Sequence, residues 1–343
     1  MIAWQLAKRN EPLVLADLPL GDLKPGYARV KVAGCGLCHT DLGFIYDDVR
    51  MRHELPLVLG HEISGTVAEG SLTGKQVLIP AVIPCRTCAP CLAGQPRICS
   101  NQLMPGNDIH GGFAEYIDVP EKELAVIPQE VDQDVLAQMS VIADAVTTPL
   151  QAIKNLGLKK GDVAIFIGVG GVGGFGALLA LAFGAEVFAL DINDQKLEKL
   201  GQAGVKHTLN VRENDIRATK KWVKEVCKAE GLPGFGHKIF ETSGSAPGQE
   251  LAFALINMGA QMATVGFTMD KLNLRISNLM AFDARIVGNW GASPEIYAEA
   301  IQLYLEGKLN LKDFTELHPL SSINEIIYKA HHEGLESRAV LVP

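Results

Sequence analysis

The stretch DVAIFIGVGGVGGFGALLALAFG, residues 162–184, begins as a continuous apolar run and ends with helical spacing. A continuous apolar run is typical of a strand that is buried on both faces of a parallel sheet. Gly168, Gly170 and Gly173 lie between the two halves and satisfy the pattern G-x-G-x-x-G. Glycines in this pattern permit a tight turn, the close approach of a pyrophosphate, and close packing of the helix on the strand. The stretch therefore predicts a strand–turn–helix unit that binds a dinucleotide.

Strand-like and helix-like segments alternate through the rest of the middle of the chain. Buried strands separated by helices form a doubly wound parallel sheet. The alternation therefore predicts an α/β unit over residues 151–285. Its further segments are the strands AEVFALDI (185–192), HKIFETSG (237–244) and QMATVGF (261–267), and the helix DQKLEKLGQAG (194–204).

One carboxylate stands where such a domain binds the adenosine ribose. Asp191 ends the second strand, about 20 residues after Gly170, which is the interval found in dinucleotide-binding folds. A negative charge at this position repels a 2′-phosphate, so we expect NAD rather than NADP. The alternative is a purely structural glycine turn followed by a solvated aspartate.

The first 150 residues have a different texture, with short β-branched runs broken by Gly and Pro. Such runs predict a β-rich unit with irregular loops. After residue 285 the chain continues with a helical stretch, 295–309, and a strand-like end, 338–343, which could belong to either unit on pattern alone. The β-branched runs are ARVKVAGCG (28–36), ISGTVAEG (63–70) and KQVLIPAVI (75–83).

The composition limits the classes of partner. Of the 343 residues, 48% are hydrophobic and 20% are charged, with a net charge of −8. This acidic balance argues against nucleic acid or an anionic membrane as the main partner. The length suits two domains, and neither a signal-peptide core nor a membrane-spanning apolar run stands out. We therefore expect a cytoplasmic protein, in which clustered cysteines are better metal ligands than disulfide partners.

Four cysteines form one such cluster in PCRTCAPCLAGQPRICS. Cys85, Cys88, Cys91 and Cys99 follow the pattern C-x₂-C-x₂-C-x₇-C. Four thiolates at these spacings predict a closed tetrahedral zinc site that stabilises a loop and has no open position for chemistry. An iron–sulfur cluster is the rival, but the rest of the ferredoxin pattern is missing. Four free thiols are the remaining alternative.

Other candidate ligands are dispersed along the chain. Cys38 lies in GCGLCHTDLG, and His61 and Glu62 lie in LGHEISG. Taken singly, the cysteine could be a core residue and the His–Glu pair a surface pair. Together they supply two ligand types that zinc accepts, whereas a catalytic zinc needs three ligands and one open position.

Asp144 is a single carboxylate within the small and apolar residues of SVIADAVTTP (140–149). A buried ionised aspartate needs a partner, which can be a backbone amide, a cationic side chain or a metal ion. One interpretation is that Asp144 caps the helix that starts near AVTTPLQAIKNL (145–156), since aspartate is a favoured N-cap. The other is a metal ligand.

The chain resembles the zinc-dependent medium-chain alcohol dehydrogenases in four motifs, which occur in the order and spacing of that family. They are CHTD (38–41), GHE (60–62), the four-cysteine loop and GVGGVG (168–173). The resemblance covers essentially the whole chain. It implies a GroES-like catalytic domain, made of residues 1–150 and 286–343 and holding two zinc ions, around a Rossmann NAD-binding domain.

Longer stretches are similar to members of this family that oxidise a cyclic secondary alcohol carried as a coenzyme A thioester. An acyl-CoA or another small-molecule alcohol is therefore the expected substrate, and a homo-oligomer, dimer or tetramer, is the expected assembly. The stretches are GCGLCHTDLGFIYD (34–47), LPLVLGHEISG (55–65), MPGN (104–107), SVIADAVTTP (140–149) and LMAFDARIVGNWG (279–291).

The resemblance assigns the ligands of a catalytic zinc. Cys38 and His61 match the first two ligands. Asp144 stands where members commonly have a cysteine as the third ligand, so a harder oxygen donor would replace sulfur. Aspartate can bind zinc at about 2.0–2.2 Å, so the departure is compatible with a metal site.

Neighbouring residues match roles around that metal. Thr40 matches the hydroxyl that accepts the proton of the substrate alcohol, and Asp41 matches a residue that orients His61 through its other ring nitrogen. Glu62 matches a catalytic-site carboxylate that can approach the metal. Gly43 replaces a histidine that ends the proton relay in some members, so the relay here would end at the cofactor ribose, another side chain or water.

The resemblance also assigns the contacts of NAD. Asp191 and Lys196 match contacts to the adenosine ribose, and His39 and Arg338 match residues near the pyrophosphate. The complete expected set is His39, Thr148, Gly168, Gly170, Gly171, Val172, Gly173, Asp191, Lys196 and Arg338.

These assignments imply oxidation of an alcohol, in which zinc favours loss of the hydroxyl proton and hydride passes to the nicotinamide. Two other functions stay open. One is a zinc-dependent polyol or simple secondary-alcohol dehydrogenase, which would act on sorbitol-like or short-chain alcohols. The other is a non-catalytic NAD-binding protein, which would hold one zinc ion, at the cysteine loop.

The loop YDDVRMRHELP (46–56) carries Arg50, Arg52 and His53 close in sequence to the metal motifs. Either these residues contact a phosphate or the pantetheine of a CoA ester, or they belong to a solvated charged loop. His110 in NDIHGGF is equally undecided.

Overall fold

The computed structural model describes residues 1–343, and the chain forms two compact units. The first unit combines Met1–Thr147 with Gly291–Pro343, and the second is Thr148–Trp290. The chain passes from one unit to the other after residues 147 and 290, where the sequence placed the changes after 150 and 285. The tail that the pattern left unassigned therefore belongs to the first unit.

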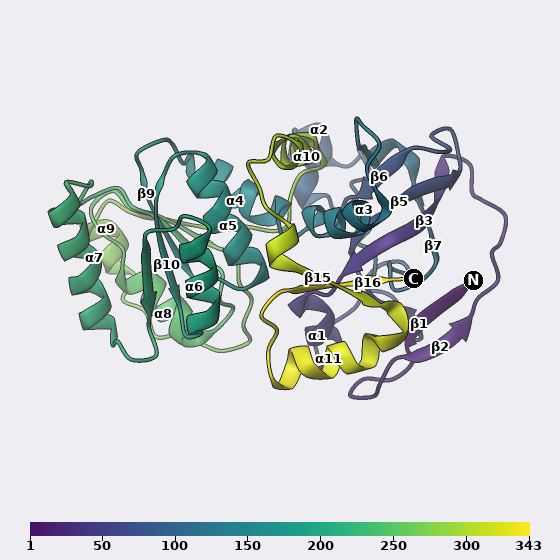
Figure 1. Ribbon diagram of the computed structural model, residues 1–343. Coiled ribbons are helices and arrows are strands. Elements are labelled where there is room, and N and C mark those ends of the chain that lie inside the picture. The colour runs from purple at the N-terminus through teal and green to yellow at the C-terminus, as the bar shows by residue number, and fades with distance from the viewer. The chain divides into compact units, whose positions relative to one another are not determined.

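The second unit contains a six-stranded parallel sheet with the order β11-β10-β9-β12-β13-β14 (Figure 1). Every side chain of β9 is buried, because its apolar run lies in the middle of a sheet that helices cover. The predicted doubly wound fold is confirmed, and β11 and β14 are strands that the sequence pattern did not reveal. The strands are β9 (Val163–Ile167), β10 (Glu186–Asp191), β11 (His207–Asn210), β12 (Lys238–Glu241), β13 (Gln261–Thr264) and β14 (Arg285–Gly288).

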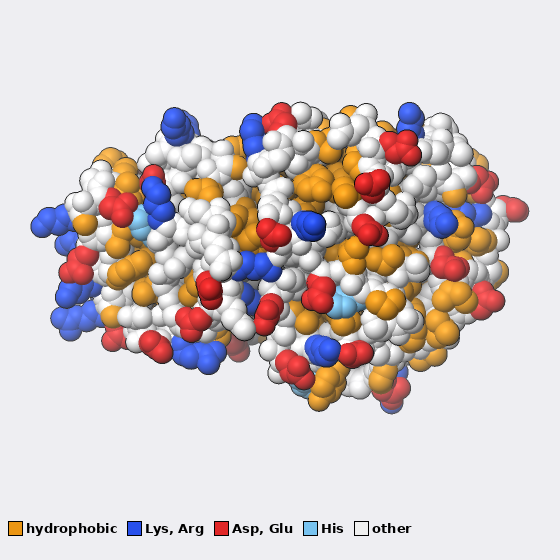
Figure 2. Space-filling model, viewed as in Figure 1, with side chains coloured by type: hydrophobic (Ala, Val, Ile, Leu, Met, Phe, Trp, Pro, Cys, Tyr) orange, Lys and Arg blue, Asp and Glu red, His pale blue; other side chains and the backbone are white.

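Helices follow the strands of this sheet. Side-chain caps fix the starts of three of them, since Asn193, Asp215 and Ser245 each accept a hydrogen bond from a backbone N–H in the first turn. Lys and Arg side chains gather over α7, whose exposed face is basic although the whole chain is acidic (Figure 2). The helices are α4 (Thr147–Leu156), α5 (Gly171–Ala182), α6 (Asp194–Gln202), α7 (Ile216–Glu230), α8 (Ala246–Ala254) and α9 (Ser277–Ala281).

The first unit is built on two sheets. A three-stranded sheet has the order β2-β1-β4, and a seven-stranded sheet has the order β15-β16-β3-β5-β6-β8, with β7 paired to β3. The C-terminal strand β16 pairs antiparallel with β3 and so joins the two chain segments of this unit in one sheet (Figure 1). The strands are β1 (Ile2–Leu6), β2 (Val14–Asp17), β3 (Tyr27–Gly36), β4 (Leu57–Val58), β5 (Glu62–Glu69), β6 (Gln76–Ile79), β7 (Tyr116–Pro120), β8 (Ala125–Val126), β15 (Thr315–Pro319) and β16 (Arg338–Val342).

Short helices connect these strands. No helix of the chain is both long enough and apolar enough to cross a membrane. The helices are α1 (His39–Tyr46), α2 (Ala89–Leu92), α3 (Gln133–Met139), α10 (Tyr297–Leu305) and α11 (Ile323–His332), with 3₁₀ turns η1 (Pro96–Ile98), η2 (Glu121–Glu123), η3 (Ser140–Ala143), η4 (Pro294–Ile296), η5 (Lys312–Phe314) and η6 (Leu320–Ser322).

A buried tyrosine fastens α10 to the loop before residue 144. The Tyr297 side chain is 1% exposed, and its hydroxyl donates to the carbonyl of Ala143. The same hydroxyl accepts from the N–H of Ala81 at 3.0 Å. Tyr297 therefore satisfies two backbone groups of the first unit that lie far from it in sequence.

We expect Tyr297→Phe to lower the free energy of unfolding by about 1–3 kcal/mol, because it removes the hydroxyl that pairs with the buried N–H of Ala81 and takes one of two side-chain donors from the carbonyl of Ala143. Tyr304→Phe on the same helix is the control; its side chain is only partly buried, and we expect a change within about 0.5 kcal/mol. Denaturant unfolding of both variants measures the difference. Equal stabilities would contradict the role of the Tyr297 hydroxyl.

Candidate active site and metal centres

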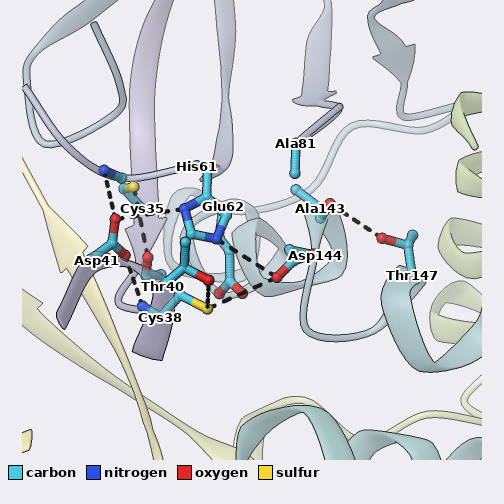
Figure 3. Close-up of polar contacts among 12 residues, drawn as sticks. Cys35, Cys38, Thr40, Asp41, His61, Glu62, Ala81, Ala143, Asp144 and Thr147 are labelled. Carbon is cyan, nitrogen blue, oxygen red and sulfur yellow. Dashed lines mark hydrogen bonds and ion pairs between the residues drawn. The ribbon is translucent and has the colours of Figure 1, made fainter. Parts of the chain in front are cut away.

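Potential metal ligands from three distant parts of the chain meet inside the first unit (Figure 3). Asp144 Oδ2 lies 3.7 Å from His61 Nε2 and 3.9 Å from Cys38 Sγ. The structure thus brings together the three residues that the family resemblance assigns to the catalytic zinc. With the neighbouring carboxylate, the full set whose ligand atoms lie within 4.8 Å of one another is Cys38, His61, Glu62 and Asp144.

The buried Asp41 carboxylate contacts the backbone next to two members of this set, Cys38 and His61. It accepts hydrogen bonds from the backbone N–H of Cys38 at 2.9 Å and of Gly60 at 3.1 Å. Its Oδ1 also lies 3.5 Å from His61 Nδ1. An imidazole whose Nδ1 faces a carboxylate presents Nε2 to a metal, so Asp41 is placed to orient His61.

Asp144 follows the turn η3, and α4 begins three residues later, at Thr147. Asp144 therefore lies two residues before the N-cap position of that helix. The preceding carbonyl, of Ala143, accepts hydrogen bonds from the Tyr297 hydroxyl and from Thr147 Oγ1, the latter at 3.2 Å (Figure 3). These bonds fix the backbone that directs Asp144 toward Cys38.

The electrostatics of the set favour a cation. Burial opposes charging of His61, but the charges of Asp41 and Cys38 outweigh burial, and the pKa of the imidazole lies well above its usual value. Burial raises the pKa of the Glu62 carboxyl, although Arg338 opposes the rise. A site that holds a proton on a buried histidine in this way also attracts a metal ion.

The donor set fits zinc. Thiolate, imidazole and carboxylate are all zinc ligands, and bonds of about 2.0–2.3 Å in a tetrahedron separate the donor atoms by about 3.4–3.6 Å. The distances of 3.7 and 3.9 Å at Asp144 are within a few tenths of an ångström of that range. Three protein ligands leave the fourth position open, as in catalytic zinc sites.

Arg338 lies on Glu62 in this structure. Its Nε donates to Glu62 Oε2 at 3.1 Å, and a terminal nitrogen donates to Oε1, with both side chains buried. Burial opposes the charge of Arg338, but Glu62 raises the pKa of the guanidinium. The contact with a pyrophosphate that the resemblance assigns to Arg338 therefore stays a proposal, because the structure shows this guanidinium engaged by the buried carboxylate.

The four cysteines of the second metal centre also meet. Sγ–Sγ distances are 3.5 Å for Cys88–Cys91 and Cys85–Cys99, and 3.6 Å for Cys88–Cys99. A disulfide would need about 2.05 Å, whereas bonds of about 2.3 Å to a tetrahedral zinc place sulfurs about 3.8 Å apart. The observed spacing fits zinc.

Protonation of these cysteines is uneven. Hydrogen bonds from the Thr87 hydroxyl and N–H lower the pKa of Cys85 to about 5, while burial raises the pKa of Cys91 to about 12. Four adjacent thiolates repel one another, so all four ionise together only with a cation between them. The donor set is therefore chemically incomplete without a metal.

The glycine-rich loop of the second unit has the geometry that its pattern predicts. Gly168 has φ +81°, and a Cβ there would lie 2.4 Å from the Cα of Ser243. A Cβ on Gly173 would lie 1.9 Å from the carbonyl oxygen of Gly168, so helix and strand pack closely only with glycine. Residues 170–172 open α5, with Gly170 as its N-cap, and direct backbone N–H groups outward.

Asp191 and Lys196 lie beside this loop. Asp191 Oδ2 accepts from the N–H of Val169 at 2.6 Å, and its Oδ1 accepts from the N–H groups of the two following residues. Lys196 Nζ lies 3.9 Å from the place where a Cβ on Gly170 would stand. Both side chains therefore lie beside the glycine loop, and the contacts with the adenosine ribose that the resemblance assigns to them stay a proposal.

The other predicted contacts divide between the units. Thr40 lies beside the first metal set, with Oγ1 3.6 Å from Cys38 Sγ, and His39 is an exposed residue at the start of α1. Thr148 is buried in α4 and belongs to the second unit. Their cofactor and proton-transfer roles stay proposals.

In the charged loop of residues 46–56, one arginine forms a salt bridge with a residue outside the loop. Arg52 forms a salt bridge with Asp108 at 3.4 Å, while Arg50 is exposed. The rings of His53 and His110 lie 5.4 Å apart, and His110 Nδ1 accepts a hydrogen bond from a backbone N–H at 3.2 Å. Burial lowers the pKa of His110, so this histidine is predominantly neutral at pH 7.

Sequence reasoning missed two parts of the site. One is Tyr297, which holds the backbone before Asp144; its helix has an apolar pattern that does not reveal a hydroxyl contact 154 residues away. The other is the pairing of Glu62 with Arg338. In the sequence, the only indications of that pair were a single acid, Glu62, among apolar residues and an arginine, Arg338, at the start of an apolar strand.

Comparison with known proteins agrees with both units. The alcohol dehydrogenase GroES-like domain matches residues 24–129, and the zinc-binding dehydrogenase domain matches residues 171–306. An alcohol dehydrogenase of Geobacillus stearothermophilus is 29% identical over 339 residues, which cover 97% of this chain and 96% of the relative.

Solved structures share the whole fold. The galactitol-1-phosphate dehydrogenase of Escherichia coli is 26% identical and superposes with a TM-score of 0.90 over 100% of both chains. The alcohol dehydrogenase of the archaeon Aeropyrum pernix has the same identity, TM-score and coverage. The likeness therefore includes both units and their connections.

We expect Asp144→Ala to reduce bound zinc from two ions per chain to one, because it removes one of three ligands from the first set and none from the cysteines. Metal analysis of the purified variant measures the ratio. Cys91→Ser is the control and removes a ligand from the other site only. Two zinc ions per chain in Asp144→Ala would contradict ligation by this carboxylate.

Proposed function

We propose that this chain, which belongs to the zinc-dependent medium-chain alcohol dehydrogenase family, oxidises 6-hydroxycyclohex-1-ene-1-carbonyl-CoA to the 6-oxo product in anaerobic benzoyl-CoA degradation. Membership makes it an NAD-dependent zinc alcohol oxidoreductase. The observation that carries the activity is the convergence of Cys38, His61 and Asp144 in a chain that also has a dinucleotide loop.

The choice of substrate rests on the longer stretches around these motifs, such as residues 34–47, 55–65 and 279–291, which resemble the dehydrogenase of that CoA ester. A CoA ester carries several negative charges, which an acidic protein must meet locally. The exposed Arg50 and the partly paired Arg52 supply positive charge in the unit that holds the metal set.

The residues of the site have separate tasks in this reaction. When bound, zinc supplies a positive charge that favours loss of the hydroxyl proton, and NAD accepts the hydride. Cys38, His61 and Asp144 would hold the metal, and Asp41 keeps His61 in the orientation for ligation. Thr40 would take the hydroxyl proton at its Oγ1 and pass it on. The product ketone is conjugated with the ring alkene, which favours oxidation.

A polyol dehydrogenase is the second candidate function. It is favoured by the likeness to the galactitol-1-phosphate dehydrogenase of Escherichia coli, which extends over the whole of both chains. In that case the same metal set and dinucleotide loop would serve a flexible, hydroxyl-rich substrate, and Arg50 or Arg52 could meet a phosphate instead of a CoA moiety.

We expect the CoA ester to be oxidised with a kcat/KM at least about 100-fold higher than that of sorbitol, galactitol 1-phosphate, cyclohexanol or 2-propanol. The reason is binding energy from the CoA moiety, which plain alcohols lack. The rate of NADH formation, followed by absorbance, measures each substrate. The free 6-hydroxycyclohex-1-ene-1-carboxylate is the matched control for the contribution of CoA.

The outcomes separate the candidates. Equal rates over the whole panel would contradict the CoA ester, and a preference for the polyols would establish the second function. No turnover of any alcohol by protein that holds two zinc ions and NAD would contradict both.

We expect Asp191→Ala to raise the affinity for NADP relative to NAD at least about tenfold, because removal of the carboxylate removes its repulsion of a 2′-phosphate. Quenching of protein fluorescence on titration with NADH and NADPH measures the ratio. Glu198→Ala, at an exposed position of α6, is the control and removes an equal charge away from the loop. An unchanged ratio in Asp191→Ala would show that cofactor choice lies elsewhere.

A further inference from the structure

Like Asp191, Glu241 is a carboxylate at the end of a strand of the parallel sheet. It is fully buried, and only one of its two carboxylate oxygens accepts hydrogen bonds. Glu241, the last residue of β12, is 0% exposed. Its Oε1 accepts hydrogen bonds from the Ser243 N–H at 2.8 Å, the Ser243 hydroxyl at 2.6 Å and the Gly244 N–H at 3.1 Å. Its Oε2 is buried without any hydrogen-bond partner. Buried carboxylate oxygens are rarely left unpaired, so this one calls for an explanation.

Glu241 lies at the switch point of the sheet. β9 and β12 are neighbours, and the order of strands runs outward from them in both directions. Dinucleotides bind outside the carboxyl ends of the strands at such a point. The turn after β12 is fastened to the glycine loop there, because Thr242 Oγ1 donates to the carbonyls of Ile167 at 3.0 Å and Gly168 at 2.7 Å.

The unpaired oxygen faces the next strand end. A Cβ on Gly266, just after β13, would lie 2.9 Å from Glu241 Oε2 and 2.2 Å from the N of Gly244. The carboxylate therefore lies between the turns that follow β12 and β13. These are the strand ends of the second half of the sheet, opposite the half that carries Asp191.

The two halves bind different parts of the cofactor. Asp191, at the end of β10, marks the adenosine side, and the pyrophosphate belongs at the start of α5. The nicotinamide then belongs with the strand ends of β12, β13 and β14. The nicotinamide ring is positively charged in NAD⁺ and neutral in NADH, so an unpaired negative charge there acts on the two forms differently.

We propose that Glu241 is a positioning residue for the nicotinamide half of the site, and that its carboxylate makes the second unit bind NAD⁺ more tightly relative to NADH. Three donors on Oε1 hold the carboxylate against the turn that follows β12. Its Oε2 has no hydrogen-bond partner. This inference rests on NAD as the cofactor and goes beyond the proposed reaction to the oxidation state that the site favours.

The test is the ratio of two dissociation constants, measured without turnover. NADH binding is followed by cofactor fluorescence, and NAD⁺ binding by displacement of NADH. We expect Glu241→Gln to raise Kd(NAD⁺)/Kd(NADH) about tenfold, because it removes the charge and keeps the shape of the side chain.

Two further variants separate charge from position. Glu241→Asp keeps the charge but is shorter and loses the hydrogen bonds to residues 243 and 244; we expect weaker binding of both cofactor forms and a ratio within about threefold of wild type. Glu186→Gln removes a partly buried charge at the amino end of β10, the opposite edge of the same sheet. We expect it to leave both constants unchanged.

Each result decides one claim. An unchanged ratio in Glu241→Gln overturns the charge effect, and wild-type affinities in Glu241→Asp overturn the positioning role. If Glu241→Gln does not fold, a ratio that shifts in Glu241→Asp, where the charge is kept, still overturns the charge effect. Failure of the wild-type protein to bind either cofactor form would instead refute the NAD assignment on which the inference rests.

Discussion

The pairing of β3 with β5 on one side and β16 on the other is the constraint on which the metal site depends. In the β3–β5 register Gly36 lies opposite Glu62, so Cys38 emerges where β5 begins. Gly36 also faces Val340 of β16, and antiparallel pairing carries Arg338 to the same end. A Cβ on Gly36 would lie 2.1 Å from Glu62 Oε2, so glycine here leaves room for the buried carboxylate. The strand register of this sheet therefore brings Cys38, Glu62 and Arg338 to the same end of the sheet.

The same arrangement of a strand-end carboxylate occurs twice in the parallel sheet. Both β10 and β12 end in an acid whose carboxylate accepts N–H groups from the turn that follows it, Asp191 in the first half and Glu241 in the second. The two differ in burial, since Asp191 is partly exposed and Glu241 is not. A partly exposed carboxylate can exchange a hydrogen bond with a ligand, whereas a buried one acts by shaping the turn and through its charge.

Local patterns predicted the parts of the protein that depend on local spacing. The glycine loop and the four cysteines each lie within one short segment, so the spacing of these residues in the sequence was enough to predict how they are arranged. The apolar surroundings of Asp144 showed that a carboxylate needed a partner but not which one. The contact between Glu62 and Arg338 depends on strand register over 276 residues, and the Tyr297 contact depends on helix packing. Neither register nor packing is encoded in a short pattern.

As a zinc ligand, the aspartate at position 144 would change the character of the metal site without changing its charge. A thiolate at Cys38, a neutral imidazole at His61 and a carboxylate at Asp144 would together neutralise a divalent ion, just as two thiolates and an imidazole would. Glu62 adds no net charge, because Arg338 is paired with it. Replacing sulfur with oxygen therefore alters only the softness of the donor, and a harder donor passes less electron density to the metal. The ion would therefore keep more of its positive charge. A larger positive charge on the metal favours loss of the proton from the substrate hydroxyl, which alcohol oxidation requires.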